Sequence, residues 1–163
     1  MLFRSALLTG NAPLTRGTMT ICGMSFRPLQ EVSQKKHLEL GVSYIPGDRQ
    51  ADGLVMSMSI TDNILLDRVT DQEFTRVGFI DFKAMTAFAK GEIERFDIRP
   101  TDPHSIVSSL SGGNQQKVVL SKWLMTNPRV LILDEPTRGI DVGAKYEIYS
   151  IINNFAKYPI LTI

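Results

Sequence analysis

Residues 130–137 read VLILDEPT, a run of four apolar residues followed by two carboxylates and a proline. An uninterrupted apolar run of this length is typical of a parallel-sheet strand that is buried on both faces. Such sheets bind ligands beyond the carboxyl ends of their strands. Asp134 therefore stands where it can hold a magnesium ion through water, and Glu135 stands further out, where it can polarise water. The alternative for this stretch alone is a strand end with a capping aspartate and a turn.

A second stretch, residues 110–117, reads LSGGNQQK. Ser111 can cap a helix that follows it, and the paired glycines let the backbone approach a ligand closely. The free N–H groups and the positive dipole end of such a helix start are suited to binding phosphate. A plain helix cap after a loop is the alternative for these residues alone.

The rest of the sequence alternates helical and extended segments, which predicts an α/β protein with a mainly parallel sheet. Apolar residues recur at helical spacing over residues 82–96. The other expected elements are a helix tail in the first ten residues, a short edge strand at 18–22, a helix at 28–40, a β-rich run at 41–45, a polar loop at 47–53, a helix from about 114 to 125, a helix capped by Asp141, and the start of a strand at 159–163.

Some side chains of these helices have an expected environment. Lys117 and Lys122 are expected to face solvent, whereas Trp123 is expected in the core. The apolar face of the last helix is expected to consist of Val142, Tyr146, Tyr149, Ile152 and Ala156.

Composition excludes several classes of protein. The 163 residues are about one domain's worth, and 43% apolar residues suffice for a core. Lys plus Arg number 18 and Asp plus Glu number 17, so a net charge of +1 argues against nucleic-acid binding through bulk charge. Cys22 is the single cysteine and has no intrachain disulfide partner. No apolar run approaches the roughly 18 residues of a membrane helix, and the apolar stretch near Met1 is too short for a secretory signal.

The two stretches, taken in this order, resemble the ATPase subunits of ABC transporters. Ser111, Gly112, Gly113 and Asn114 match the family's signature motif, residues 130–135 match the Walker B strand with its catalytic glutamate, and residues 139–141 match the D-loop. The finer resemblance is to importers of simple sugars and nucleosides. It includes YIPGDR at 44–49, which is similar to the second ATPase half of those proteins, and TRGIDVGAK at 137–145.

This resemblance implies an incomplete ABC-type P-loop NTPase core with a mainly parallel sheet and a helical subdomain. The whole chain, 1–163, would form a partial ATPase domain, with the helical subdomain at roughly 55–125 and the Walker B and D-loop core at 128–163. The implied function is ATP binding and hydrolysis that energises the import of a sugar or nucleoside. The implied cofactors are ATP and Mg²⁺, and the implied location is peripheral, on the cytoplasmic face of the cell membrane.

The resemblance also implies roles and partners. Glu135 would act as general base or position water, and Asp134 would hold Mg²⁺. The signature residues Ser111, Gly112, Gly113 and Asn114 would complete the nucleotide site of an opposite ATPase domain in a head-to-tail dimer, and Asp141 would couple the two sites. Other implied partners are transmembrane permease subunits and, indirectly, a solute-binding protein, with no nucleic acid.

The sequence departs from the family pattern at three points. It contains no G-x-x-x-x-G-K-[ST] phosphate loop, and neither histidine, His37 or His104, follows Glu135 as the switch histidine would. Gly47 stands where the family's second halves usually have Glu. We therefore expect the chain to begin just past the phosphate loop and to be inactive alone. The alternative is a silent fragment that supplies only the signature motif to a partner; a soluble ABC protein of DNA repair or translation would need long coiled-coil or basic insertions.

Overall fold

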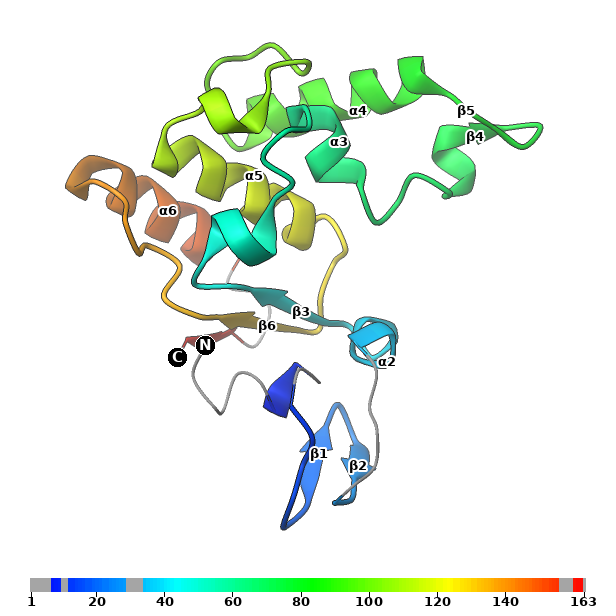
Figure 1. Cartoon of the computed structure of the whole chain (residues 1–163), viewed down its shortest axis with the longest axis vertical. Helices are drawn as coiled ribbons and strands as arrows, with labels where there is room; N and C mark the ends of the chain where they lie inside the picture. The colour runs from blue at the N-terminus through cyan, green and yellow to red at the C-terminus, as the bar shows by residue number, and fades with distance from the viewer. Residues whose placement is uncertain (1–6, 10–11, 29–33, 156–159, 163) are drawn as a thin grey trace.

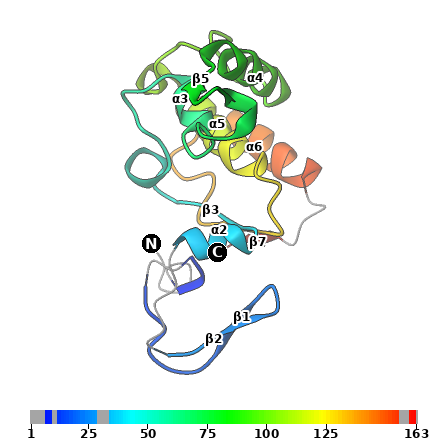
Figure 2. The ribbon, with the colours of Figure 1, turned by 90° about the vertical axis from the view of Figure 1, so that its right-hand side faces the viewer.

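A parallel sheet lies at the centre of the molecule. The computed structural model describes residues 7–9, 12–28, 34–155 and 160–162. Its main sheet has the strand order β3 (Val42–Ile45), β6 (Val130–Leu133), β7 (Ile160–Thr162), with both pairs parallel. The sheet separates a layer of helices from an N-terminal hairpin (Figures 1 and 2). The stretch VLIL thus forms the middle strand, as its sequence predicts.

Strand β6 contributes to two apolar clusters. Leu131 and Leu133 belong to the large core that the helices share, whereas Ile132 packs in a smaller cluster with Ile21 and Phe26 of the hairpin. Successive side chains of a strand point to opposite faces, so this alternation shows that both faces of β6 are covered. The prediction of a strand buried on both faces is confirmed.

The helical layer consists of four helices, and each begins at a residue whose side chain caps its first N–H groups. They are α3 (Ile60–Leu65), α4 (Phe82–Arg95), α5 (Gly112–Leu124) and α6 (Val142–Asn154), capped by Ser59, Asp81, Ser111 and Asp141 respectively. Helix α4 ends one residue before the predicted boundary. Between the helices lie the 3₁₀ turns Gln72–Phe74 and Val107–Ser109 and a small hairpin of β4 (Thr75–Arg76) and β5 (Phe79–Ile80).

The N-terminal part contains the predicted short strand and a return strand that sequence reasoning missed. Strand β1 (Met19–Ile21) pairs antiparallel with β2 (Met24–Phe26), and helix α2 (Gln34–Glu39) lies within the helix predicted at 28–40. Leu7 and Leu8 are helical. The rest of the expected helix tail, residues 29–33 and the ends of the predicted last strand lie outside the described residues.

The segment at 47–53 is not the expected loop. Arg49–Gly53 forms a π-helical turn, because the Asp48 carboxylate accepts hydrogen bonds from the N–H groups of Gln50 and Ala51, both at 3.1 Å. This turn follows β3 directly and places Arg49 beside the start of α5.

The expected face of α6 is right at Ile152 and wrong at three other positions. Ile148 and Ile152 are buried, but Val142, Tyr146 and Tyr149 are exposed by 85%, 79% and 48%. The helix packs through Ile148 and Ile152, which are four residues apart, so the buried stripe is rotated from the one predicted. Ala156 lies outside the described residues.

The expected exposure of Lys117 and Lys122 is also wrong. Both side chains are largely buried because α5 is the central helix of its layer, and each ammonium is paired. Lys122 Nζ lies 3.1 Å from a carboxylate oxygen of Asp67. Trp123 is partly buried against the core, near its expected place. Across the described residues, no helix is both long and apolar enough to cross a bilayer.

Candidate functional site

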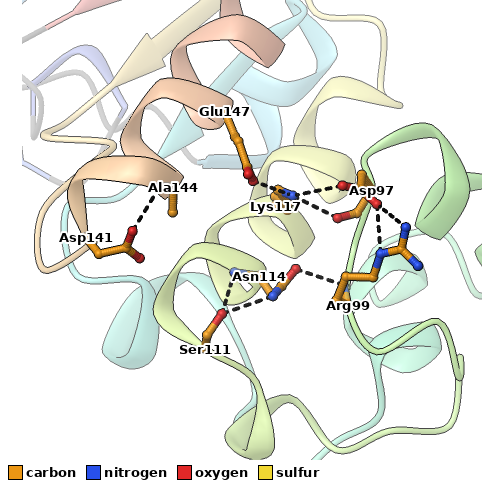
Figure 3. A network of polar contacts seen from close by, with 8 residues as sticks. All are labelled: Asp97, Arg99, Ser111, Asn114, Lys117, Asp141, Ala144 and Glu147. Atoms are coloured by element: carbon orange, nitrogen blue, oxygen red, sulfur yellow. Dashed lines mark hydrogen bonds and ion pairs between the residues drawn. The ribbon is translucent and has the colours of Figure 1, made fainter.

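At the start of α5, Ser111 is exposed, Gly112 and Asn114 are partly buried, and Gly113 is buried. Ser111 is exposed and has extended backbone, and its Oγ accepts hydrogen bonds from the Asn114 N–H at 3.4 Å and from Asn114 Nδ2 at 3.0 Å (Figure 3). Asn114 Oδ1 in turn accepts a hydrogen bond from the N–H of Arg99 at 2.8 Å. The first N–H groups of a helix have no carbonyl partner within it. Ser111 therefore caps α5 as the sequence predicts, and the binding of an anion at this helix end stays a prediction.

The two glycines of this segment allow close packing against neighbouring segments of the chain. A Cβ atom on Gly112 would lie 2.7 Å from Arg49 Nη2 and 3.3 Å from the carbonyl oxygen of Gly139. A Cβ atom on Gly113 would lie 2.7 Å from Ala144 Cβ. The start of α5 thus lies directly against the D-loop segment and the first turn of α6.

Arg49 connects three parts of the site, and sequence reasoning gave it no role. Its Nε donates to Gln115 Oε1 at 3.2 Å, and its Nη1 donates to the carbonyl oxygen of Arg138 at 2.8 Å. Burial lowers the pKa of Arg49, while Asp48 acts in the opposite direction; a guanidinium stays protonated at neutral pH. The only sequence signal was its place in the YIPGDR stretch.

Asp134 lies at the carboxyl end of β6 and is 4% exposed. Tyr44 Oη donates a hydrogen bond to Asp134 Oδ2 at 3.1 Å. A Cβ atom on Gly47 would lie 3.1 Å from the Asp134 carbonyl oxygen and 3.7 Å from its Cγ. The segment after β3 therefore contacts the predicted metal residue, and Gly47 brings no side chain to it.

The single carboxylate of Asp134 fits a magnesium ion that takes most of its ligands from phosphate and water. Among the described residues, no group of three or more His, Cys, Asp or Glu side chains is arranged to hold a metal. Magnesium bound with a nucleotide needs one or two protein carboxylates, because phosphate oxygens and water fill the other positions. A single carboxylate at the end of the central strand meets that requirement.

Glu135 points away from the sheet. Its side chain is 58% exposed, and Oε2 lies 3.8 Å from Arg138 Nη1. Its backbone φ is +43°, in the left-handed region that few glutamates adopt. Such conformations cluster at functional sites. At the carboxyl end of β6, the buried carboxylate of Asp134 is therefore followed directly by the exposed carboxylate of Glu135.

Asp141 is exposed and caps α6, accepting a hydrogen bond from the Ala144 N–H at 3.0 Å. One turn further along α6, Glu147 Oε2 lies 2.8 Å from Lys117 Nζ, which also donates to the carbonyl oxygen of Asp97 at 2.8 Å (Figure 3). The signature helix and the helix after the D-loop are therefore joined by an ion pair as well as by packing. The sequence did not predict this contact between Lys117 and Glu147.

The fold is that of an ATP-binding cassette. Residues 5–138 match the ABC transporter family, and the chain belongs to this family. Solved structures agree on the fold: a dimeric post-hydrolysis state of an ATP-binding cassette bound to ADP and Pi aligns with a TM-score of 0.69 at 18% identity, covering 98% of this chain and 68% of that one.

Curated relatives of the chain are ATP-binding proteins of sugar import. The chain is 46% identical over 155 residues to the ribose import ATP-binding protein RbsA of Lactococcus lactis subsp. lactis, covering 92% of this chain and 30% of the relative. It is 44% identical over 143 residues to a putative ribose/galactose/methyl galactoside import ATP-binding protein of Agrobacterium fabrum, covering 88% and 28%. The chain thus spans about 30% of the length of these relatives.

Proposed function

We propose that this chain is part of an ATP-binding and ATP-hydrolysing subunit that energises import of a sugar or nucleoside across the cell membrane. The proposal rests on two features that occur in the same fold. Asp134 and Glu135 follow the carboxyl end of the central strand, and Ser111, which is exposed, caps the signature helix. The names of the relatives, which refer to ribose and galactoside import, support the substrate class.

In this proposal Glu135 orients and deprotonates the attacking water, because its carboxylate is exposed beyond the sheet. Asp134 would hold Mg²⁺ through water, and the ion supplies neutralisation of charge on the phosphates when it is bound. Ser111, Gly112, Gly113 and Asn114 offer a hydroxyl and backbone N–H groups to the triphosphate of an opposite domain. Asp141 couples the two sites through the first turn of α6.

The proposed partners follow from these residue roles. A second ATPase domain, in a head-to-tail dimer, would supply the phosphate loop that faces this signature segment. Permease subunits would dock on residues 47–62 and the helices up to 96, and a solute-binding protein would act through the permease. The subunit would then be peripheral, on the cytoplasmic face of the membrane, and would need no nucleic acid.

A second candidate is a catalytically silent chain that supplies only the signature motif to a partner. These 163 residues include LSGG but no G-x-x-x-x-G-K-[ST], so by themselves they can complete only the site of a partner. Without that loop most triphosphate affinity is missing. We therefore expect a polypeptide of these residues alone to show no steady ATP turnover.

The test uses the chain with a complete ATPase domain from one of the ribose import relatives. ATP should promote capture of the chain, and Gly112→Asp should abolish capture, because a carboxylate would enter the site of the phosphates. Gly91→Asp is the matched control, since Gly91 lies in α4 with open space around it. Capture that is independent of ATP, or that Gly112→Asp leaves intact, would contradict the proposal.

Turnover tests the catalytic candidate. If the purified chain hydrolyses ATP steadily and Glu135→Gln removes that activity, then the chain is catalytic and the silent alternative is wrong. Capture without turnover is the result expected for these residues alone under either candidate, because they contain no G-x-x-x-x-G-K-[ST].

A further inference from the structure

The β4–β5 hairpin and the start of α4 carry an exposed apolar surface, here called the hairpin surface. It consists of Val77, Phe79, Ile80 and Phe82, which are exposed by 98%, 77%, 42% and 69%. Figure 1 shows the hairpin at the outer edge of the helical layer, far from the sheet and from the start of α5. The proposed nucleotide chemistry does not involve these residues, although Phe82 begins α4, one of the helices that the proposed function offers to a permease.

The two residues at the tip of the hairpin adopt the backbone conformation of a tight turn, although valine is unfavourable in the first of these positions. Val77 and Gly78 have φ of +51° and +82°, and Arg76 pairs with Phe79 across the turn. Two-residue turns of this kind favour Asn, Asp or Gly at the first position, and a β-branched residue there is strained. Core packing does not explain Val77, because almost its entire surface is exposed.

Positive charge lies beside the apolar tip. Lys83 and Lys90 are exposed on the outer face of α4, where they line a shallow hollow of about 370 Å³ together with Phe82, Thr86 and Ala87. Within the described ranges, neither lysine forms an ion pair. The nearby carboxylate of Asp81 caps α4 and lies 3.4 Å from Arg76, so its charge is already compensated; Glu94 follows one turn beyond Lys90.

We propose that the hairpin surface, with Lys83 and Lys90, binds the interface of an anionic phospholipid bilayer. Exposed aromatic and aliphatic side chains enter the headgroup region while neighbouring ammonium groups meet lipid phosphates. The surface offers four apolar side chains, three of them on the hairpin and Phe82 at the start of α4, which is few for a stable protein interface of roughly 20–30 residues a side. The net charge of +1 gives the whole chain little attraction to anionic lipid, so the local cluster must supply it.

The test is co-sedimentation of the full chain, without nucleotide, with vesicles of phosphatidylglycerol and phosphatidylcholine or of phosphatidylcholine alone. The chain should bind the anionic vesicles, and binding should weaken with salt. Phe79→Ser with Phe82→Ser should reduce partitioning about tenfold or more. Lys83→Gln and Lys90→Gln should each reduce it about fivefold.

Tyr146→Ser is the matched control, because Tyr146 is an aromatic residue on α6 that is 79% exposed, and it should leave binding unchanged. Equal binding to both vesicles, or no loss in the phenylalanine and lysine variants, would overturn the proposal. So would vesicle-free self-association that the phenylalanine variant abolishes, because the surface would then join two copies. If circular dichroism shows that the phenylalanine variant is unfolded, the two lysine variants alone test the proposal. Because no nucleotide is present, failure here leaves the ATP-dependent capture unaffected.

Discussion

At the scale of single residues, the site depends on backbone placement more than on unusual side chains. Asp134 and Glu135 are adjacent, yet one is 4% exposed and the other has a side chain 58% exposed. The left-handed backbone of Glu135 turns the chain as it leaves β6. One carboxylate is thereby positioned near the sheet and the other toward water, which is the division that the proposed chemistry needs.

We predict that the strain at Glu135 is measurable as a stability difference. Glu135→Asn should leave the free energy of unfolding unchanged or raise it by up to about 1 kcal/mol, because asparagine tolerates φ near +43°. Glu135→Val should lower it by about 1–2 kcal/mol, because a β-branched residue does not. Urea unfolding gives both values. Equal stability of the two variants would mean that the backbone relaxes out of the left-handed region.

Arg49 shows what sequence cannot reveal at this scale. Its partners Gln115 and Arg138 lie 66 and 89 positions away. Local pattern identified YIPGDR as a motif, but it carried no information about which distant atoms the guanidinium would meet. Lysine at this position would lack the planar fork that makes both contacts.

At the scale of elements, the contact between α5 and α6 holds the signature segment against the D-loop segment. Gly113 and Ala144 are the closest point of that contact, since a Cβ on Gly113 would fall 2.7 Å from Ala144 Cβ. The helices meet where one has a glycine and the other an alanine, so no larger pair fits at this separation.

We predict that Gly113→Ala lowers the free energy of unfolding by about 1–3 kcal/mol through overpacking. Ala144→Gly should cost up to about 1 kcal/mol through helix propensity. In the double variant the overpacking disappears, so the total loss should be clearly smaller than the sum of the single losses. Thermal or urea unfolding of the four proteins measures this, and strict additivity would show that the two residues do not touch.

The ion pair between Lys117 and Glu147 should contribute a second coupling between these helices. The lysine side chain is 6% exposed and that of Glu147 55%, so solvent screens the pair only from one side. A double-mutant cycle with Lys117→Met and Glu147→Gln should give a coupling of about 1 kcal/mol. The exposed pair of Lys36 and Glu39, with side chains 45% and 51% exposed, is the control and should give less than about 0.5 kcal/mol. Equal couplings would contradict the role of burial.

The elements show where sequence reasoning succeeds and where it fails. The run at 130–133 and the periodic stretch at 82–96 predict β6 and α4, because a strand and a helix respectively bury most of their apolar residues; Phe82, which is 69% exposed, is the exception. The buried lysines of α5 were missed because their burial depends on Asp67, Asp97 and Glu147, which reach them only in the folded molecule. The face of α6 was missed for the same reason, since its orientation depends on α5.

At the scale of the whole molecule, helices and sheet share one core. The large cluster joins Ile45, Leu131 and Leu133 of the strands to Ile64, Ile93 and Leu120 of α3, α4 and α5. The expected boundaries, with a helical subdomain at 55–125 and a strand-containing core at 128–163, remain a prediction. Because apolar contacts cross that boundary, neither part can lose its packing without exposing the other.

We therefore predict one cooperative thermal transition for the helical layer and the sheet. Fluorescence of Trp123, the single tryptophan, and far-UV circular dichroism should give the same midpoint. Leu120→Ala, at a residue that is 0% exposed, should lower the free energy of unfolding by about 2–5 kcal/mol. Both midpoints should therefore fall equally. Leu66→Ala is the control, because Leu66 is 39% exposed, and it should shift them little. Midpoints that separate in the wild type, or a Leu120→Ala variant that moves only the fluorescence, would show that the helical layer unfolds independently of the sheet.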